Sequence, residues 1–143
     1  MSYLDNAATS YPKPESVYKR IDHILRSIGG NPGRSGHSMA LDAGRVVFEA
    51  RESAARLFNI KDASRIAFTK NATEAINVAF KGILKPGDHV VTTSIEHNAV
   101  MRPLQRLERD WGVKLTRVKA DKEGWVSPGD IEKAITNNTK LVS

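Results

Sequence analysis

The sequence predicts an α/β domain built on a mostly parallel sheet flanked by helices. Segments with apolar residues at helical spacing alternate with short β-branched runs along its 143 residues. The connections between these segments are short, as in strand–helix–strand units of a parallel sheet. With 40% hydrophobic and 27% charged residues, a chain of this length can form one hydrophobic core.

The first third of the chain predicts two helices separated by a loop. Residues 14–28 begin with a proline suited to a first helical turn and carry isoleucines at helical spacing up to the glycine pair at 29–30. Residues 29–36 contain four glycines and a proline, which predicts a loop. A longer helix follows and ends near Asn59. Its apolar face is expected to consist of Ala43, Val47, Ala50, Ala54 and Leu57.

The middle of the chain predicts a strand that leads directly into a helix. Residues 65–69 (RIAFT) are expected to form a short buried strand. A helix is expected over residues 72–84, with one apolar face. The turn residues at 85–88 (KPGD) then end it.

The second half repeats this alternation. We expect strands over residues 89–93 and 113–118, with a helix over 98–111 between them. A short helix over 127–135 follows, and residues 140–143 resemble the first residues of a further strand.

The charge balance favours a solvated basic face over a nucleic-acid site, and it would also suit an anionic cofactor or substrate. Twenty-two Lys and Arg against sixteen Asp and Glu give a net charge of +6. The basic residues are dispersed, and at 6% the aromatic residues are too few for an obvious base-stacking platform. We therefore expect a solvated basic face and no nucleic-acid partner.

Composition excludes several further classes of site. The chain has no cysteine, so disulfides, thiolate metal sites and a cysteine nucleophile within these residues are excluded. No run approaches the roughly 20 apolar residues of a membrane span, and the N-terminus lacks a signal-peptide pattern. A cytoplasmic protein without a membrane partner is the default expectation.

The segment around Thr73 is the most informative for function. Asn71 is a good N-cap residue, and Glu74 completes a capping-box spacing at the start of an apolar helix. This junction would expose the amides of Ala72 and Thr73, together with the Thr73 hydroxyl, to a phosphate. A capped helix with nothing bound is the alternative, and the spacing leaves both open.

A second candidate residue is His97, in the segment SIEHNA at residues 94–99. This segment follows a predicted strand and precedes a helix, and ligands bind at that edge of open α/β sheets. Histidine is also well suited to proton transfer near neutral pH. The alternative is that Asn98 caps the helix and His97 is an ordinary surface residue. The four histidines are widely spaced and form no metal-binding pattern.

Four segments together resemble the cysteine desulfurase branch of the class V aminotransferases. They are LDNAAT (Leu4–Thr9), GNPGRSGH (Gly30–His37), NATEAIN (Asn71–Asn77) and EHNAV (Glu96–Val100). The resemblance implies a pyridoxal-phosphate (PLP) enzyme of the aspartate aminotransferase fold type (fold type I). It further implies that residues 1–13 form an N-terminal arm and 14–143 an incomplete large, cofactor-binding domain.

The resemblance also assigns roles to individual residues. It implies that Ala72 and Thr73 bind the cofactor phosphate, and that His97 stacks on the pyridine ring and acts in proton transfer. Three further positions resemble residues that line the substrate pocket: Ala8, Arg34 and His37.

The resemblance implies a parent enzyme that converts L-cysteine to L-alanine and transfers the sulfur to an enzyme cysteine as a persulfide. The family's Schiff-base lysine usually follows a histidine, and this chain has no His-Lys pair. We therefore expect a truncated and inactive N-terminal portion of a homodimeric enzyme that could use a sulfur-acceptor protein. The alternatives are another class V activity, such as a selenocysteine lyase or an aminotransferase, and a non-catalytic anion-binding α/β module.

Overall fold

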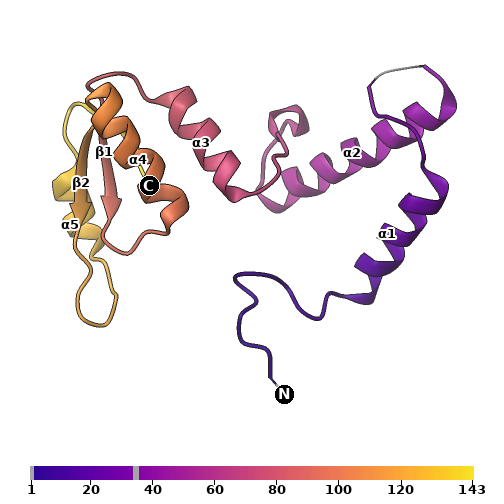
Figure 1. Cartoon of the computed structure of the whole chain (residues 1–143), viewed down its shortest axis with the longest axis horizontal. Coiled ribbons are helices and arrows are strands. Elements are labelled where there is room, and N and C mark those ends of the chain that lie inside the picture. The colour runs from indigo at the N-terminus through magenta and orange to yellow at the C-terminus, as the bar shows by residue number, and fades with distance from the viewer. Residues whose placement is uncertain (1, 34–35) are drawn as a thin grey trace. The chain divides into compact units, whose positions relative to one another are not determined.

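The computed structural model describes residues 2–33 and 36–143, which divide into two units between Ala67 and Phe68. The N-terminal unit (residues 1–67) is helical, and the C-terminal unit (residues 68–143) combines helices with strands (Figure 1). The α/β character predicted from the sequence therefore belongs to the second unit.

The N-terminal unit contains helices α1 (Glu15–Ser27) and α2 (Ser38–Leu57) and the short 3-10 helix η1 (Ala63–Arg65). The start of α2 is determined by His37, whose Nδ1 accepts a hydrogen bond from the Ala40 amide at 3.2 Å. A side-chain acceptor at this position satisfies one of the amides that a first helical turn leaves without a partner.

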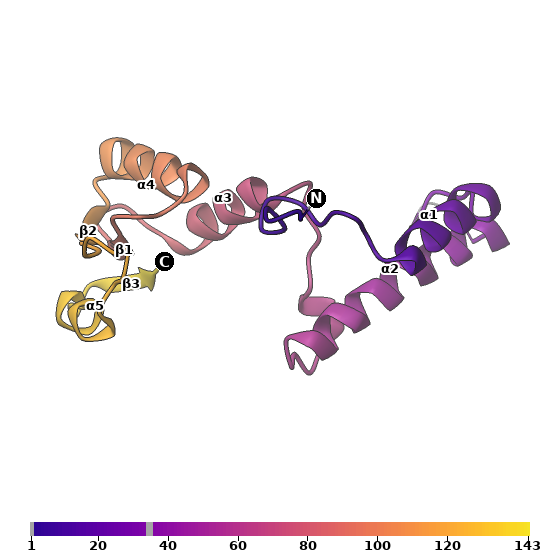
Figure 2. The same ribbon diagram turned by 90° about the horizontal axis from the view of Figure 1, so that it is seen from below.

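The C-terminal unit begins with helix α3 (Ala72–Ile83). The elements after it are β1 (His89–Thr93), α4 (Asn98–Trp111), β2 (Lys114–Val118), α5 (Pro128–Ala134) and β3 (Thr139–Val142). The described residues of this unit form three parallel strands in the order β2-β1-β3, which confirms the predicted parallel sheet. Figure 2 shows helices α4 and α5 on opposite sides of the strands.

The hydrophobic core of this unit lies between the sheet and helices α3 and α4. Val90 on β1 and Leu104 on α4 are completely buried at its centre. The helical spacing of apolar residues places one face of each helix toward the strands, which is why burial and periodicity agree. The other buried members are Phe80, Leu84, Val100, Leu107 and Val113.

The strand predicted over residues 65–69 is wrong. Arg65 ends η1, and the residues after it have no regular secondary structure, with the Phe68 side chain 55% exposed. A strand is stable only when a neighbouring strand pairs with its amides and carbonyls. In the described part of the chain the sheet consists of β1, β2 and β3, and none of them pairs with this segment.

Within the described residues, no helix has both the length and the apolar character needed to span a bilayer.

Candidate functional site

Helix α3 begins with a well-formed cap. The Asn71 side-chain oxygen accepts a hydrogen bond from the Glu74 amide at 2.9 Å, as the sequence predicts. The Glu74 carboxylate in turn accepts one from the Lys70 amide at 2.7 Å, one residue before the expected Asn71 amide. The cap therefore fixes the direction in which α3 leaves the preceding segment.

The first two amides of α3 remain available for a ligand. Among the described residues, the amides of Ala72 and Thr73 donate to no protein acceptor, and neither does the Thr73 hydroxyl. The helix dipole adds partial positive charge at this end of the 12-residue helix. These donors can bind an anionic oxygen without losing any protein hydrogen bond.

The turn after β1 positions His97. Thr93, the last residue of β1, donates from its hydroxyl to the Glu96 carboxylate at 3.1 Å. The Ser94 hydroxyl accepts a hydrogen bond from the Ala120 amide at 2.9 Å. The first contact is within the turn, and the second joins the turn to the residues after β2. Together they hold His97 at the carboxyl end of the sheet.

His97, and not Asn98, caps helix α4. The Nδ1 atom of His97 accepts a hydrogen bond from the Ala99 amide at 3.0 Å, and Asn98 is the first residue of the helix. The alternative in which Asn98 caps the helix is therefore wrong. An accepting Nδ1 leaves the proton of a neutral imidazole on Nε2, which is the ring atom available to a ligand.

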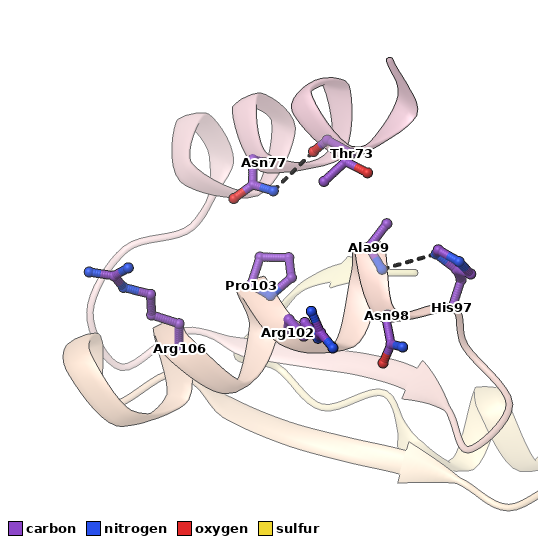
Figure 3. A pocket seen from close by; sticks show the side chains of 8 residues that line it. All are labelled: Thr73, Asn77, His97, Asn98, Ala99, Arg102, Pro103 and Arg106. Carbon is purple, nitrogen blue, oxygen red and sulfur yellow. Dashed lines mark hydrogen bonds between the residues drawn. The ribbon is translucent and has the colours of Figure 1, made fainter. Parts of the chain in front are cut away.

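Thr73 and His97 line a common hollow of about 390 Å³ between α3 and α4. Figure 3 shows Thr73 and Asn77 on α3 facing the turn of α4 that carries Ala99 and Pro103. In the described part of the chain, no carboxylate lines this hollow. The complete lining is Thr73, Asn77, His97, Asn98, Ala99, Arg102, Pro103 and Arg106.

The electrostatics of the hollow come mainly from the arginines of α4. Arg106 forms an ion pair with Asp110 at 3.1 Å, and Asp110 also contacts Arg109 at 2.8 Å. The hydrogen bond between Arg109 and Asp110 lowers the pKa of the Asp110 carboxyl and raises the pKa of the Arg109 guanidinium. Asp110 therefore stays ionised near neutral pH and compensates only part of the positive charge beside the hollow.

Two of the three residues that the resemblance assigns to the substrate pocket, Ala8 and His37, belong to the N-terminal unit. Ala8 is part of a turn in which its amide donates to the Asp5 carbonyl at 3.1 Å. His37 caps α2, which gives it a local structural role. Arg34 lies outside the described residues. The substrate-binding roles of these three residues stay predictions.

Sequence reasoning missed the basic side of the hollow. Asn98, Arg102 and Arg106 recur every four residues, so they lie along one face of α4. This spacing was visible in the sequence, but only the packing of α3 against α4 shows that the face borders a hollow.

The donor set suits the phosphate of PLP. Unpaired backbone amides at a helix start, a hydroxyl and guanidinium groups are typical phosphate-binding groups. Among the described residues, no cluster of three or more His, Asp or Glu could hold a metal ion. The residues therefore fit an anionic cofactor.

The family model and the most similar sequences that we compared indicate the same family. The chain matches the sequence model of the family described as Aminotransferase class-V over residues 2–143. It is 41% identical over 142 residues to a probable cysteine desulfurase of Methanothermobacter thermautotrophicus. It is 39% identical over 145 residues to the cysteine desulfurase IscS of Clostridium botulinum. Each alignment covers 99% of this chain but only 35% or 36% of the relative, so the chain spans about a third of their length.

Solved structures agree with the sequence matches. The apo structure of a cysteine desulfurase from Thermococcus onnurineus NA1 has a TM-score of 0.86 and 34% sequence identity. A structure described as a NifS-like protein has a TM-score of 0.82 and 32% identity. Both matches cover 98% of this chain, and they cover 35% and 38% of the two structures.

Proposed function

The chain belongs to the class V aminotransferase family, and on this basis we propose that it forms the phosphate-binding side of the PLP site of a cysteine desulfurase. The observation that carries the proposal is the start of α3, where the amides of Ala72 and Thr73 have no partner among the described residues and Thr73 lines the same hollow as His97. The names of the relatives support cysteine as the substrate of the whole enzyme. The proposal includes an N-terminal arm over residues 1–13 and a large domain that begins at residue 14.

The residues of this chain bind and orient the cofactor in the proposed site. The amides of Ala72 and Thr73 and the Thr73 hydroxyl donate to the phosphate, where the α3 dipole favours negative charge. The His97 ring stacks on the pyridine ring, and its capping bond to the Ala99 amide fixes its orientation. When bound, PLP supplies an electron sink that stabilises a carbanion on the amino acid. With Nδ1 occupied by the capping bond, any proton that His97 transfers leaves from or arrives at Nε2.

The proposed reaction converts L-cysteine to L-alanine and moves the sulfur to a cysteine of the enzyme. That cysteine must come from outside these 143 residues, because this sequence contains none. The proposal includes substrate contacts from Ala8, Arg34 and His37, a cytoplasmic homodimer, and delivery of sulfur to an acceptor protein.

A binding titration tests the proposed phosphate site. PLP is titrated into the 143-residue chain and into its Thr73→Val and Thr73→Ser variants, with amide NMR shifts as the readout. Loss of the hydroxyl in Thr73→Val removes a hydrogen bond to a charged group, worth about 1.5–3 kcal/mol, or roughly a 10- to 150-fold weaker affinity. The serine variant retains the hydroxyl and is expected to bind within about threefold of the parent chain. Equal affinities for the parent and the valine variant would place the phosphate elsewhere.

A second experiment addresses the chemistry of the chain itself. We propose that the chain alone neither forms alanine from cysteine nor bonds covalently to PLP, because none of its lysines follows a histidine as in the family. Borohydride reduction with PLP, followed by peptide mapping, is expected to give no stoichiometric lysine adduct. A single modified lysine together with alanine formation would contradict this.

A further inference from the structure

Arg102 differs from the other arginines of α4. Arg106 and Arg109 both contact Asp110, at 3.1 and 2.8 Å. Arg102 has no ion pair or hydrogen bond to any residue that the structure describes. An exposed guanidinium with five donors is therefore available on the face of α4 that borders the hollow.

The hollow has an excess of positive charge. Arg102 and Arg106 both line the hollow, and among the described residues no Asp or Glu side chain lines it. Asp110 lies outside the lining and is shared between Arg106 and Arg109, so the charge of Arg102 stays uncompensated. A dianion entering the hollow gains attraction without displacing a protein carboxylate from Arg102.

The hollow is also larger than a phosphate bound at the start of α3 requires. A volume of about 390 Å³ lies within the range of small-molecule sites, about 300–1,000 Å³. Thr73 borders it from α3, and Arg102 borders it from α4, one turn after Asn98 (Figure 3). A group bound between the two helices therefore meets neutral donors on one side and a guanidinium on the other.

We propose that Arg102 is a second phosphate-binding residue of this site, opposite the amides and hydroxyl at Thr73. The inference rests on the proposed function and adds to it the group that supplies formal positive charge. Arginine suits this role because its planar fork can donate two parallel hydrogen bonds to phosphate oxygens.

Two substitutions on the same helix test the proposal. Arg102→Gln removes the charge at the hollow, and Arg109→Gln removes an equal charge on α4 outside it. PLP, inorganic phosphate and pyridoxal, which lacks the phosphate, are titrated into the parent 143-residue chain and both variants at several salt concentrations. Amide NMR spectra of the variants without ligand check that the fold is retained.

The expected result is specific to phosphate. Arg102→Gln should weaken the binding of PLP and of inorganic phosphate about tenfold and leave the binding of pyridoxal unchanged. The salt dependence of phosphate binding should also become shallower, because an exposed charge pair is screened by salt. Arg109→Gln should change affinity by less than about twofold. Arg102→Lys should restore part of the affinity, since it retains the charge but loses the planar fork.

The outcomes separate this inference from the proposed function. If Thr73→Val weakens PLP binding and Arg102→Gln does not, the role of Arg102 is overturned while the phosphate site stands. If Arg102→Gln weakened the binding of pyridoxal as much as that of PLP, the role would also be overturned, because Arg102 would then contact a part of the cofactor other than its phosphate. If neither variant changes PLP affinity, the phosphate site and the role of Arg102 both fail.

Discussion

The two units of this chain bury very different side chains. In the C-terminal unit, Val90, Val91 and Leu104 are completely buried between strands and helices. In the N-terminal unit, the buried hydrophobic residues among those described are three alanines, Ala40, Ala43 and Ala55. Several large apolar side chains there are exposed, among them Leu25 and Leu57, each at 78%.

The difference shows that an amphipathic helix does not by itself make a core. Helices α1 and α4 both carry apolar residues at helical spacing, but α4 packs on a sheet whose central strand β1 pairs on both sides. The sheet supplies an apolar surface from residues distant in sequence, and most helical stability comes from such packing. We therefore expect stability to reside mainly in the C-terminal unit.

Removing a side chain from the centre of that core should change stability most. Leu104→Ala should destabilise the C-terminal unit by about 2–5 kcal/mol, because a fully buried leucine is lost and a cavity remains. Leu25→Ala in the N-terminal unit is the matched control and should change stability by less than about 0.5 kcal/mol. Urea denaturation followed by circular dichroism measures both. Equal losses would show that the two units are stabilised alike.

A smaller effect is expected at the start of α3. Asn71→Ala removes the side chain that accepts from the Glu74 amide and should cost about 1 kcal/mol of unfolding free energy. Asn98→Ala changes the same residue type at the first position of α4, where His97 provides the cap, and should cost much less. Comparable losses from the two variants would mean that Asn98 contributes to capping after all.

Thr92→Val is expected to stabilise the C-terminal unit. Thr92 is 1% exposed, and its hydroxyl has no hydrogen-bond partner among the described residues. Replacing an unsatisfied hydroxyl by a methyl group of similar size should raise the unfolding free energy by up to about 1 kcal/mol. Thr93→Val is the control with the opposite sign, because its hydroxyl donates to Glu96. A loss of stability in Thr92→Val would indicate that its hydroxyl has a partner in solution.

The smallest effect concerns a local contact of the N-terminal unit. Hydrogen bonds from Ser64 lower the pKa of Asp62, and the Ser64 amide lies 2.9 Å from its carboxylate. Because the pKa of Asp62 is lower in the folded state, its carboxylate contributes to folding stability at pH values above the unfolded-state pKa. That contribution is lost as the pH falls through the folded-state pKa. That window lies below the ordinary aspartate pKa of about 3.9. Ser64→Ala removes the hydroxyl, the larger cause of the shift, and keeps the amide. A carboxyl NMR titration should therefore show a lower pKa for Asp62 in the parent chain than in this variant, and identical curves would show that the hydroxyl does not contribute.

Much of the C-terminal unit was predictable from local patterns. The β-branched run at residues 89–93 and the helical spacing over 98–111 match β1 and α4 at both ends. The spacing of Asn71 and Glu74 identified the start of α3 and, with it, the unpaired amides of Ala72 and Thr73 in the first turn. These features depend on neighbouring residues, whose conformational preferences are encoded where they act.

Local patterns along the chain were enough to identify the family, the alternation of helices and strands, and Thr73 and His97 as site candidates. Which of these features meet depends on the folded arrangement. The run at 65–69 has strand character, but in the described chain it lacks a pairing partner. Local patterns also did not show that Arg102 lines the same hollow as Thr73. Nor did they show that the ring of the buried His89 lies between the hydroxyls of Thr116 and Thr139, at 2.8 and 2.7 Å. Pairing, burial and shared hollows depend on residues tens of positions apart, and local preferences do not specify which distant partner will be present.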